Sequence, residues 1–460
     1  MSETLVLHPE SDAGMDAADW IRANDVREVE CLIPDMNGVL RGKILPAEKF
    51  LSAIDGGALY MPTSALLVCA DGNYSGSIDE GFAYGDPDML LVPDLGSLCL
   101  SPDSRPQRAF VLADACYPAD RLWSALPRAL LKSVLSLYAE KGWRAVVAPE
   151  LEFYLTAPNP DPREPVMAPV AANGRREGAQ HPYDMEALEL FDPVMRRIYE
   201  HCAITGIPVD TLSHETGAAQ LEVNLLHGDP LELADQVVLF KRIARRAAAE
   251  QGMNLTFMAK PIEGQAGSAM HLHVSLVGPA GENLFADHEG ADTPVFRHFM
   301  GGLQKYIPEA MPLLAPHVNS YRRIRPSFSA AANIEWSHDN RSCGLRVPKG
   351  GRDARRVENR LPGADANPYL AIAATLLCGS LGVEERLERS PEAFGNAYLA
   401  QSSLPRTMAQ AVERLTACAP LRSLLGEEFF QTFLRVKQRE MDAFESVVTA
   451  WEREHLLLKA

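Results

Sequence analysis

The sequence predicts a mixed α+β (α/β) protein in which a small β-rich N-terminal domain precedes a larger domain of strands and helices. Three observations support this prediction. Segments in which apolar and polar residues alternate, as in half-buried strands, recur along the chain. Between them lie stretches with apolar residues every three or four positions, which is the period of a helix. Up to about residue 114 the chain has instead short strands among many Gly, Pro and Asp residues.

In the N-terminal part, residues 15–24 are predicted as a short helix. Residues 28–33 alternate like a strand, run into the turn sequence PDMNG and continue into a second strand over 39–44. Together they predict a hairpin with Asp35 at its tip. An aspartate in such a position usually stabilises the turn itself. A further short strand is predicted over 89–92.

In the larger domain, predicted helices and strands are separated by long loops at 156–181 and 317–348. The helices are predicted over 122–141, 185–205, 230–251, 294–306, 367–382, 407–415 and 427–454. The strands are predicted over 144–155, 218–226, 270–276 and 357–361.

Composition indicates a soluble globular protein and argues against several functions. The 460 residues are 47% hydrophobic and 23% charged, enough for a large core and two domains. A net charge of −17 argues against nucleic acid and anionic membranes as partners. The eight cysteines form no C-x-x-C pair, so we expect reduced thiols in a cytoplasmic protein. No apolar run is long enough to span a membrane, and residues 1–16, without signal-peptide features, are expected to be mobile.

The stretch 259–276, AKPIEGQAGSAMHLHVSL, contains the strongest local sign of a functional site. Its second half alternates strictly, so His271, His273 and Ser275 share one face of a strand and apolar residues share the other. The loop before the strand is rich in small residues, which lets backbone approach a ligand closely. The alternative is a pair of half-exposed histidines on an ordinary sheet.

Polar residues stand at i and i+2 on four predicted strands, and therefore on one face of each. They are Glu150/Glu152, Glu222/Asn224, His271/His273 and Glu358/Arg360, with Glu215 just before the second of these strands. Carboxylates are not buried together unless cations offset their repulsion. Mg²⁺ or Mn²⁺ is expected, because oxygen ligands dominate and closely spaced His or Cys ligands for zinc are lacking. The alternative is a set of solvated sheet edges.

Arginines crowd one span of this acidic chain. They are Arg322, Arg323, Arg325, Arg341, Arg346, Arg352, Arg355, Arg356 and Arg360. Guanidinium groups suit carboxylates and phosphates, and metals beside arginines indicate phosphoryl transfer. The sequence has no P-loop and no G-x-G-x-x-G motif, so ATP would bind by another structure. For single residues such as Arg325 and Arg356, a surface or subunit contact is the alternative.

Several motifs together resemble one known family. The segments DMNGVLRGK, GDPDMLLVPD, APELEF, HETGAAQLEV, KPIEGQAGSAMHLHVSL, NSYRR, DNRSCGLRVP and VENRLPGADANPYLA are similar to those of the glutamine synthetase superfamily, bacterial type I class. The resemblance runs from about residue 26 to the C-terminus and favours the γ-glutamyl-amide branch, which includes γ-glutamylpolyamine synthetases. It implies a β-grasp domain over 17–115 and, over 116–460, a catalytic domain with a curved antiparallel sheet flanked by helices.

The resemblance also implies roles for individual residues. One metal ion would be held by Glu152, Glu215 and Glu222, and a second, bridging the phosphates of ATP, by Glu150, His271 and Glu358. Two or three Mg²⁺ or Mn²⁺ ions are expected per site. Glutamate would contact Glu152, Gly267, Arg323 and Arg360, and ATP would contact His273, Ser275, Arg341 and Arg346. Asp35 would reach into a neighbouring subunit's site and take a proton from the amine, with Arg323 and Arg341 as further catalytic residues.

Three positions depart from the family pattern. Ser329 stands where ammonia-using members have a flap glutamate, and a small side chain that is not anionic favours a bulkier amine over ammonium. Ala266 replaces the loop asparagine that gates glutamate, so looser closure is expected. Tyr398 lies near the position of an adenylylated tyrosine in some members, but the surrounding motif is not kept and this regulation is not expected.

The predicted function is therefore that of an ATP-dependent ligase that joins the γ-carboxylate of L-glutamate to a primary amine. A polyamine or a monoamine would react with γ-glutamyl phosphate, in amine or polyamine catabolism or nitrogen assimilation. Ammonia-using glutamine synthetase is one alternative, and a non-catalytic scaffold of the same fold is another. The resemblance implies a homo-oligomer of hexameric rings, stacked as a dodecamer, with active sites shared between neighbouring subunits.

Overall fold

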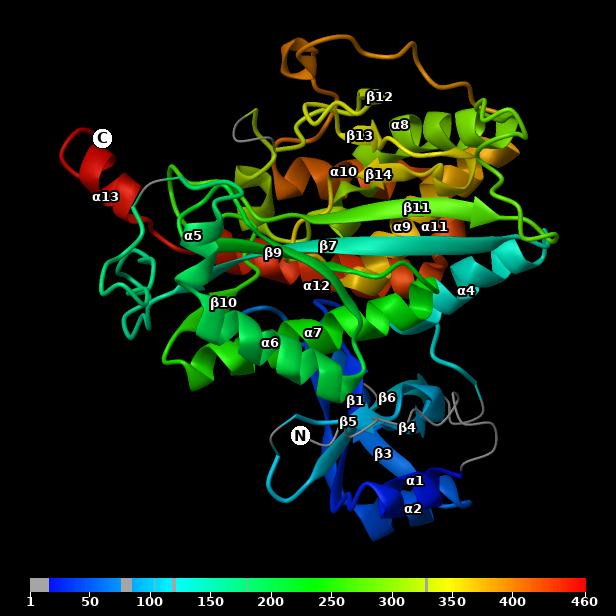
Figure 1. Cartoon of the computed structure of the whole chain (residues 1–460), viewed down its shortest axis with the longest axis vertical. Coiled ribbons are helices and arrows are strands. Elements are labelled where there is room, and N and C mark those ends of the chain that lie inside the picture. The colour runs from blue at the N-terminus through cyan, green and yellow to red at the C-terminus, as the bar shows by residue number, and fades with distance from the viewer. Residues whose placement is uncertain (1–15, 76–84, 103, 118–120, 179, 327–329) are drawn as a thin grey trace.

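Two β-sheets with helices packed around them organise the chain, and the predicted mixed α/β fold is confirmed (Figure 1). The computed structural model describes residues 16–75, 85–102, 104–117, 121–178, 180–326 and 330–460. Within these residues, no helix has both the length and the apolar character needed to cross a membrane.

The N-terminal sheet has six strands in the order β2-β1-β6-β4-β3, with β5 paired to β6. The strands are β1 (Glu28–Pro34), β2 (Leu40–Pro46), β3 (Leu59–Pro62), β4 (Asp88–Pro93), β5 (Cys99–Leu100) and β6 (Arg108–Cys116). Helices α1 (Ala17–Ala23) and α2 (Ala47–Ile54) belong to the same part of the chain. The central strand β6 runs parallel to β1 and was not among the predicted strands. The division into 17–115 and 116–460 stays a prediction.

The second sheet has eight strands in the order β12-β13-β14-β11-β7-β9-β8, with β10 paired to β7. The strands are β7 (Arg144–Thr156), β8 (Val209–His214), β9 (Gln220–Leu225), β10 (Asn254–Thr256), β11 (Met270–Val277), β12 (Trp336–His338), β13 (Leu345–Val347) and β14 (Val357–Asn359). All neighbours are antiparallel except β12 and β13, which run parallel. The prediction of an antiparallel sheet therefore holds for the strands that bear the polar pairs.

Helices cover this sheet and supply most of the remaining core. They are α4 (Pro127–Ala139), α5 (Met185–Glu189), α6 (Asp192–Thr205), α7 (Pro230–Glu250), α8 (Pro294–Leu314), α9 (Pro368–Glu384), α10 (Met408–Ala417), α11 (Ala419–Leu425) and α12 (Glu427–Glu445). A last helix, α13 (Ala450–Leu456), has no buried residue and lies outside this packing. Helix α9 is buried along almost its whole length. It packs very closely on α8, since a Cβ at Gly302 would lie 2.2 Å from the carbonyl oxygen of Cys378.

Three predicted helices differ from the observed ones. The helix predicted over 185–205 is broken at residues 190–191, and Pro193 stands in the first turn of α6, where proline is tolerated. Helix α8 continues past its predicted end through Pro308 and Pro312, which are both buried in its packing. The long C-terminal helix ends at Glu445, and α13 begins again behind a Thr449–Glu452 capping box.

Candidate active site

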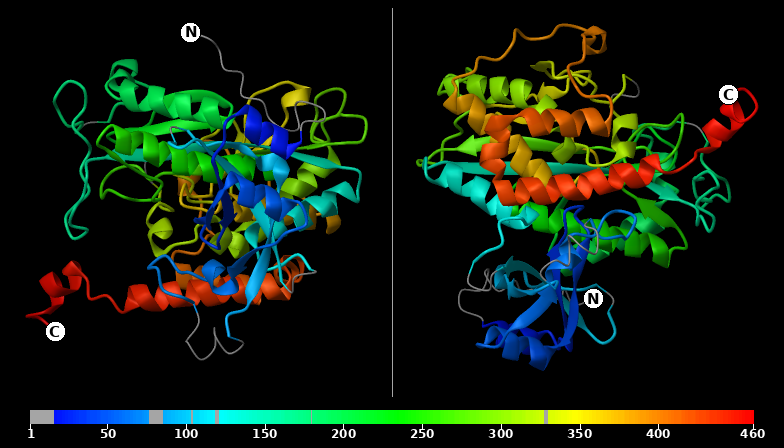
Figure 2. Two further views of the ribbon diagram at one scale, coloured as in Figure 1. Left: turned by 90° about the horizontal axis from the view of Figure 1, so that it is seen from below. Right: turned by 180° about the vertical axis from the view of Figure 1, so that it is seen from behind.

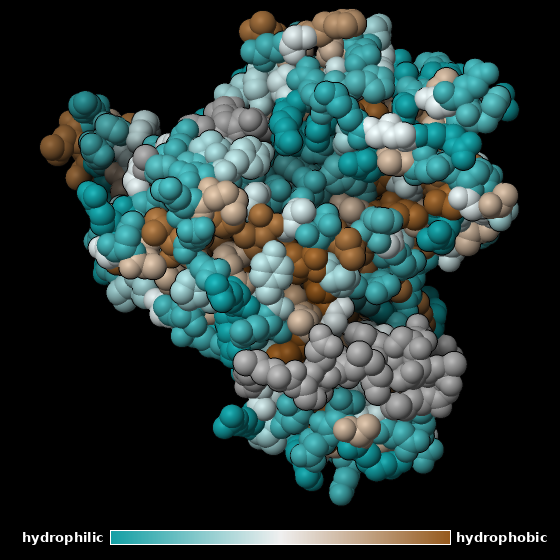
Figure 3. Space-filling view, viewed as in Figure 1, coloured by the Kyte–Doolittle hydropathy of each residue, from teal (hydrophilic) through white to brown (hydrophobic). Residues whose placement is uncertain are grey.

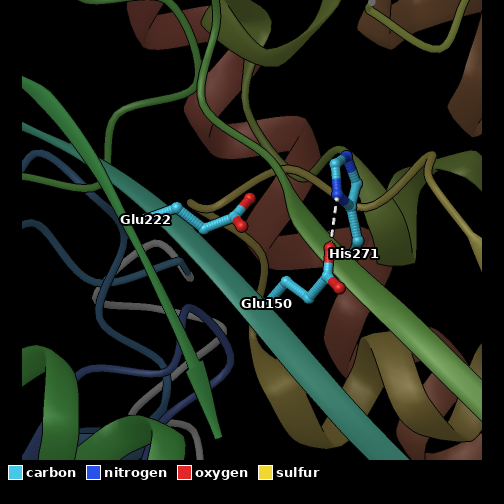
Figure 4. Close-up of side chains that lie close together, drawn as sticks. All are labelled: Glu150, Glu222 and His271. Atoms are coloured by element: carbon cyan, nitrogen blue, oxygen red, sulfur yellow. Dashed lines mark hydrogen bonds and ion pairs between the residues drawn. The ribbon is translucent and has the colours of Figure 1, made fainter. Parts of the chain in front are cut away.

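The register of the central strands brings the predicted polar pairs together on one face of the sheet. The cross-strand pairs are Glu150/Asn224, Glu152/Glu222, Glu150/His271, His273/Glu358 and Arg346/Glu358. Directly opposite residues in a sheet have neighbouring side chains, so five separate strands build one polar surface. Figure 4 shows three of these side chains, with Glu222 on β9, Glu150 on β7 and His271 on β11.

Three carboxylates converge at the end of this surface nearest β9. Glu152, Glu215 and Glu222 each place an oxygen so that the three atoms lie within 4.8 Å of one another. Burial and the neighbouring Glu215 raise the pKa of Glu152 to about 8, and burial also raises the pKa of Glu215 and of Glu222. A carboxyl group whose pKa is raised in this way keeps its proton at a higher pH than usual. Such a group is suited to exchange the proton for a divalent cation. The donor set of three carboxylates fits Mg²⁺ or Mn²⁺.

A second group gathers around Glu150, where both imidazoles of β11 contact the same carboxylate. The Nδ1 atom of His271 lies 3.2 Å from one oxygen and the Nε2 atom of His273 lies 2.8 Å from the other. The Nδ1 atom of His273 accepts from Arg356 Nε at 3.0 Å. Because arginine only donates, the His273 proton must sit on Nε2, where it orients Glu150 and leaves no lone pair for a metal. His271 keeps its Nε2 atom available, 3.8 Å from Glu152.

Burial and the nearby Arg360 lower the pKa of His271 to about 4, so this imidazole is neutral at physiological pH. A neutral imidazole is the form that binds a metal. The ligand atoms of Glu150, Glu222 and His271 lie within 4.8 Å of one another, as do those of Glu150, His273 and Glu358. All six predicted metal ligands thus meet in one place. Glu358 lies 3.8 Å from His271, and the division of the six ligands between two metal ions stays a prediction.

Arginines flank the carboxylates. Arg346 donates to Glu358 at 2.6 Å and to Asp339 at 2.8 Å, and Arg360 pairs with the other oxygen of Glu358. Burial acts to raise the pKa of Glu358, but Arg360 outweighs it and holds the pKa at about 2. Arg323 is also buried, and its Nε atom has no hydrogen-bond partner among the described residues. A buried guanidinium with unused donors is suited to a bound carboxylate or phosphate.

The loop before β11 packs directly against these arginines. A Cβ at Gly267 would lie 2.4 Å from the Cγ atom of Arg323, which explains the glycine. The Ala266 carbonyl accepts from the buried Tyr154 hydroxyl at 2.8 Å, and the Gly267 carbonyl accepts from Gln220 at 3.0 Å. The loop before β11 is thus held in place at its backbone. Whether Ala266 loosens its closure stays a prediction.

A cavity of about 500 Å³ opens beside Glu150. Its walls include His273 and Ser275, the two residues predicted to face the nucleotide, and Arg356. Arg356 was left open between a surface role and a site role, and the structure brings it into the site. The sequence already indicated this placement. Arg356, Glu358 and Arg360 stand two residues apart, so in a strand their side chains share one face.

Tyr183 lies beside the residues that lead to Glu215, since its backbone N–H donates to the His214 carbonyl at 3.0 Å, and it was not predicted as a site residue. Burial and Glu215 raise the pKa of its hydroxyl while Arg341 lowers it, which places the ring within electrostatic reach of both. Its backbone has φ 60°, a left-handed conformation that non-glycine residues rarely adopt outside functional or strained positions. Tyr183 follows the long loop over 156–181, where no periodic pattern marks single residues.

Asp35 does not join this group within the one chain that the structure describes. The Asp35 side chain is 0% exposed and accepts from the backbone of Asn37 and Val39, each at 2.9 Å, and from Arg41 at 2.8 Å. Both oxygens are therefore committed to its own turn, and its predicted role in a neighbouring site would require this arrangement to open. Ser329 lies outside the described residues.

The similarity to known proteins extends over nearly the whole chain. The family "Glutamine synthetase, catalytic domain" matches residues 124–456. The γ-glutamylputrescine synthetase of Escherichia coli is 36% identical over 448 residues, which are 95% of this chain and 93% of the relative. The γ-glutamylethanolamide synthetase of Streptomyces coelicolor is 34% identical over 442 residues, 94% and 93% of the two chains. The glutamate–isopropylamine ligase of a Pseudomonas species is 32% identical over 450 residues, 94% and 95% of the two chains.

Solved structures agree with these relatives. The structure described as apo GmaS without ligand has a TM-score of 0.83 and 28% identity, and the match covers 96% of this chain and 99% of the other. Sequence, fold and the carboxylate face of the second sheet therefore lead to one conclusion: the chain belongs to the glutamine synthetase family.

Proposed function

We propose that this protein is an ATP-dependent ligase that joins the γ-carboxylate of L-glutamate to a primary amine. The observation that carries the proposal is the meeting of five glutamates with His271 on one sheet face, bordered by buried arginines. Such a site can hold divalent cations and a phosphoryl group together. The preference for an amine rests on the relatives named for putrescine, ethanolamine and isopropylamine.

In the proposed first step, an oxygen of the glutamate γ-carboxylate attacks the γ-phosphorus of ATP, and ADP leaves. Arg323 and Arg360 would hold glutamate carboxylates, and Gly267 would leave room for the substrate beside Arg323. Arg341, Arg346 and Arg356 would offset the charge on the phosphates. Bound Mg²⁺ or Mn²⁺, held by the glutamates and His271, would supply further neutralisation of the phosphates.

In the proposed second step, the amine nitrogen attacks the γ-carbonyl carbon of γ-glutamyl phosphate, and inorganic phosphate leaves. Alkylamines have pKa values of about 10, so the nucleophile must lose a proton in the site. We place the amine beside Tyr183, near the carboxylate cluster, because Asp35 of the same chain is enclosed in its turn. An aromatic ring with negative charge nearby suits a cation with an apolar substituent.

The test is a phosphate-release assay with glutamate, ATP and Mg²⁺, comparing ammonium, isopropylamine, ethanolamine and putrescine. The proposal expects an organic amine to give the highest kcat/KM. Fastest turnover with ammonium would instead identify a glutamine synthetase. Absence of any glutamate-dependent phosphate release would favour the non-catalytic scaffold, against which the complete ligand set argues.

The wider setting is also a proposal. We expect a homo-oligomer of hexameric rings in which neighbouring subunits share active sites, an enzyme of amine catabolism or nitrogen assimilation, and a cytoplasmic location. The oligomer is supported by the family and by an exposed apolar C-terminal segment.

A further inference from the structure

A second, larger cavity lies between the N-terminal sheet and the catalytic part of the chain. Its volume is about 1370 Å³. Its walls come from the tip of the β1–β2 hairpin, one face of α7, the short 3₁₀ turn η3 (Val318–Arg322) and the end of α12. None of the described residues assigned to glutamate, ATP, metal or amine lines it. We call it the interdomain cavity.

The interdomain cavity is basic in an otherwise acidic protein. Its lining contains three acidic residues, Asp71, Asp365 and Glu440, and six basic ones, Lys241, Arg242, Arg245, Arg322, Lys437 and Arg439. The net charge of the whole chain is −17, so a basic cavity is a strong local reversal. Concave sites lined by one sign of charge concentrate ligands of the opposite sign.

The acidic residues of the lining offset only part of its positive charge. Glu440 accepts from Lys437 of the same lining at 2.9 Å, from Asn37 at 2.6 Å and from the backbone of Ala70 at 2.8 Å. The Oδ2 atom of Asp365 accepts from the Ser320 hydroxyl at 2.6 Å, and its Oδ1 atom has no hydrogen-bond partner among the described residues. Asp71 acts electrostatically on Arg439, but no carboxylate of the lining forms an ion pair with Arg245 or Arg322.

Helix α7 presents its basic residues to the cavity at helical spacing. Val238, Lys241, Arg242 and Arg245 follow the i, i+3, i+4, i+7 pattern of one helix face. Lys241 is buried, and its ammonium donates to the carbonyl of Ala366 at 2.8 Å. Burial lowers the pKa of Lys241 to about 7, and Asp365 acts in the opposite direction. An anionic ligand in the space beside Lys241 would favour the charged form further.

Three arginines of the lining lack an anionic partner. Across the part of the chain that the structure describes, Arg245, Arg322 and Arg439 form no ion pair and no side-chain hydrogen bond. The guanidinium of Arg245 instead lies over the ring of Phe257, 5.2 Å from its centroid. Guanidinium groups that line a cavity without partners are available for carboxylates or phosphates.

From this geometry we propose that the interdomain cavity is a binding site for a small organic anion with two or more negative charges, carboxylate or phosphate. Lys241 and the arginines 245, 322 and 439 are its charged ligands, and Phe257 and Met441 supply apolar walls. Because both sheets contribute to the lining, the bound anion joins the N-terminal part to the catalytic part.

The wall of the interdomain cavity is connected to the loop before β11 through one side chain. Asn319 lines the cavity, and its amide accepts from the Lys260 backbone at 2.9 Å and donates to the Lys260 carbonyl at 3.0 Å. Lys260 stands at the base of the loop and bonds in turn to the carbonyl of Gln265. An anion that shifts η3 therefore acts on the loop, and we expect it to change the KM for glutamate. This second part rests on the proposed function.

Binding is tested by calorimetry on the full chain with tricarballylate and, separately, inorganic pyrophosphate, in metal-free buffer at 0.15 M salt. No ATP, glutamate or amine is present, so the result does not depend on the ligase activity. The expected result is one saturable site per chain for at least one of the two anions. The anion that binds more tightly distinguishes carboxylate from phosphate chemistry.

The variant is the double substitution Arg245→Gln/Arg322→Gln, which alters exposed side chains and leaves the buried Lys241 in place. We expect binding to weaken at least tenfold. The control is Arg246→Gln on the same helix, since Arg246 pairs with Glu250 and does not line the cavity. Lack of saturable binding by the wild type, or equal binding by the double variant, would overturn the site.

The coupling has its own measurement. The KM for glutamate, with and without the anion that binds, should shift at least twofold in the wild type and stay constant in the double variant. An unchanged wild-type KM overturns the coupling.

Discussion

At the scale of single residues, the Asp35 carboxylate accepts the hydrogen bonds that stabilise its own turn. Asp35→Ala would leave two backbone N–H groups and Arg41 without their acceptor in a fully buried position. Loss of such hydrogen bonds costs about 2 kcal/mol or more. We therefore expect a lower Tm, with amide synthesis per folded enzyme largely retained, measured by thermal unfolding and by the phosphate-release assay.

The matched control is Asp161→Ala, because Asp161 also accepts from a backbone N–H in its own turn but is exposed to solvent. It should change Tm very little. If Asp35→Ala instead abolished amide synthesis while Tm and glutamate-dependent ATP hydrolysis stayed normal, the result would support the predicted role of Asp35 in a neighbouring subunit's site.

The glutamate cluster predicts how metal and pH together set stability. In the metal-free fold the pKa of Glu152 is about 8, against an ordinary value of 4.5. The folded state thus binds more protons than the unfolded state between these two values, so the free energy of unfolding falls as pH rises through that window. A divalent cation replaces the protons and stabilises the fold more at the upper end.

We expect the increase in Tm caused by Mg²⁺ or Mn²⁺, relative to EDTA, to grow steadily from pH 5.5 to pH 8.5. Glu152→Gln removes the titrating carboxyl, and its EDTA curve should depend less on pH. The same metal-induced shift at both ends of the range would contradict a carboxylate cluster that exchanges protons for metal.

The chemistry of the site was predictable from the sequence because strands have a period of two. That pattern put Glu150 beside Glu152 and His271 beside His273 on one face. The pairing of strands could not be read from local pattern, and it is the register of β11 against β7 and β14 that sets both imidazoles on Glu150. Tyr183 escaped prediction because tertiary structure alone places it at the site.

At the scale of elements, the long amphipathic helices and the alternating strands were predicted from the sequence. The residues at which several of them begin or end were not predicted. Helix α8 continues through two prolines because its packing on α9 offsets the lost hydrogen bonds. Strand β6 was missed, since its burial on both faces leaves a nearly continuous apolar run without alternation.

A buried ion network joins these elements across the two sheets. Arg128 of α4 pairs with Asp94 and Asp114 of the N-terminal part and with Asp235 of α7, at 2.7, 2.9 and 2.8 Å. Asp235 also accepts from the Tyr369 hydroxyl of α9 at 2.5 Å. Removing one partner of a buried ion pair costs about 3–5 kcal/mol, since it leaves an uncompensated charge.

We therefore expect Arg128→Met to lower Tm severely, and the added change Asp235→Leu to recover part of the loss. Arg108→Met is the control, because Arg108 and Glu28 are each about one-third exposed, and the buried Glu30, 3.7 Å from Arg108, keeps Arg242 as a partner. Such pairs contribute at most about 1 kcal/mol. Equal losses for Arg128→Met and Arg108→Met would show that the network does not join the two parts of the chain.

At the scale of the whole molecule, the C-terminal segment stands away from the body in every view (Figures 1 and 2). Helix α13 has no buried residue. Its flanks expose Val448, Leu457 and Leu458, at 62%, 72% and 94%, and Trp451 is exposed at 61%. Figure 3 shows hydrophobic side chains at its tip. A projecting apolar segment that contributes nothing to its own core is typical of a contact between subunits.

Deleting residues 447–460 should therefore leave the fold intact and reduce the size of the assembly, measured as molar mass by light scattering. The double substitution Trp451→Glu/Leu458→Glu should act in the same direction without shortening the chain. The control is Phe394→Glu, which alters a side chain that is 92% exposed on another loop.

Because the proposed active sites are shared within a ring, the outcome also separates two kinds of contact. A smaller assembly that still forms amide would assign the segment to contacts between rings, and one that has lost amide synthesis would assign it to contacts within a ring. An unchanged molar mass would remove the segment from assembly altogether.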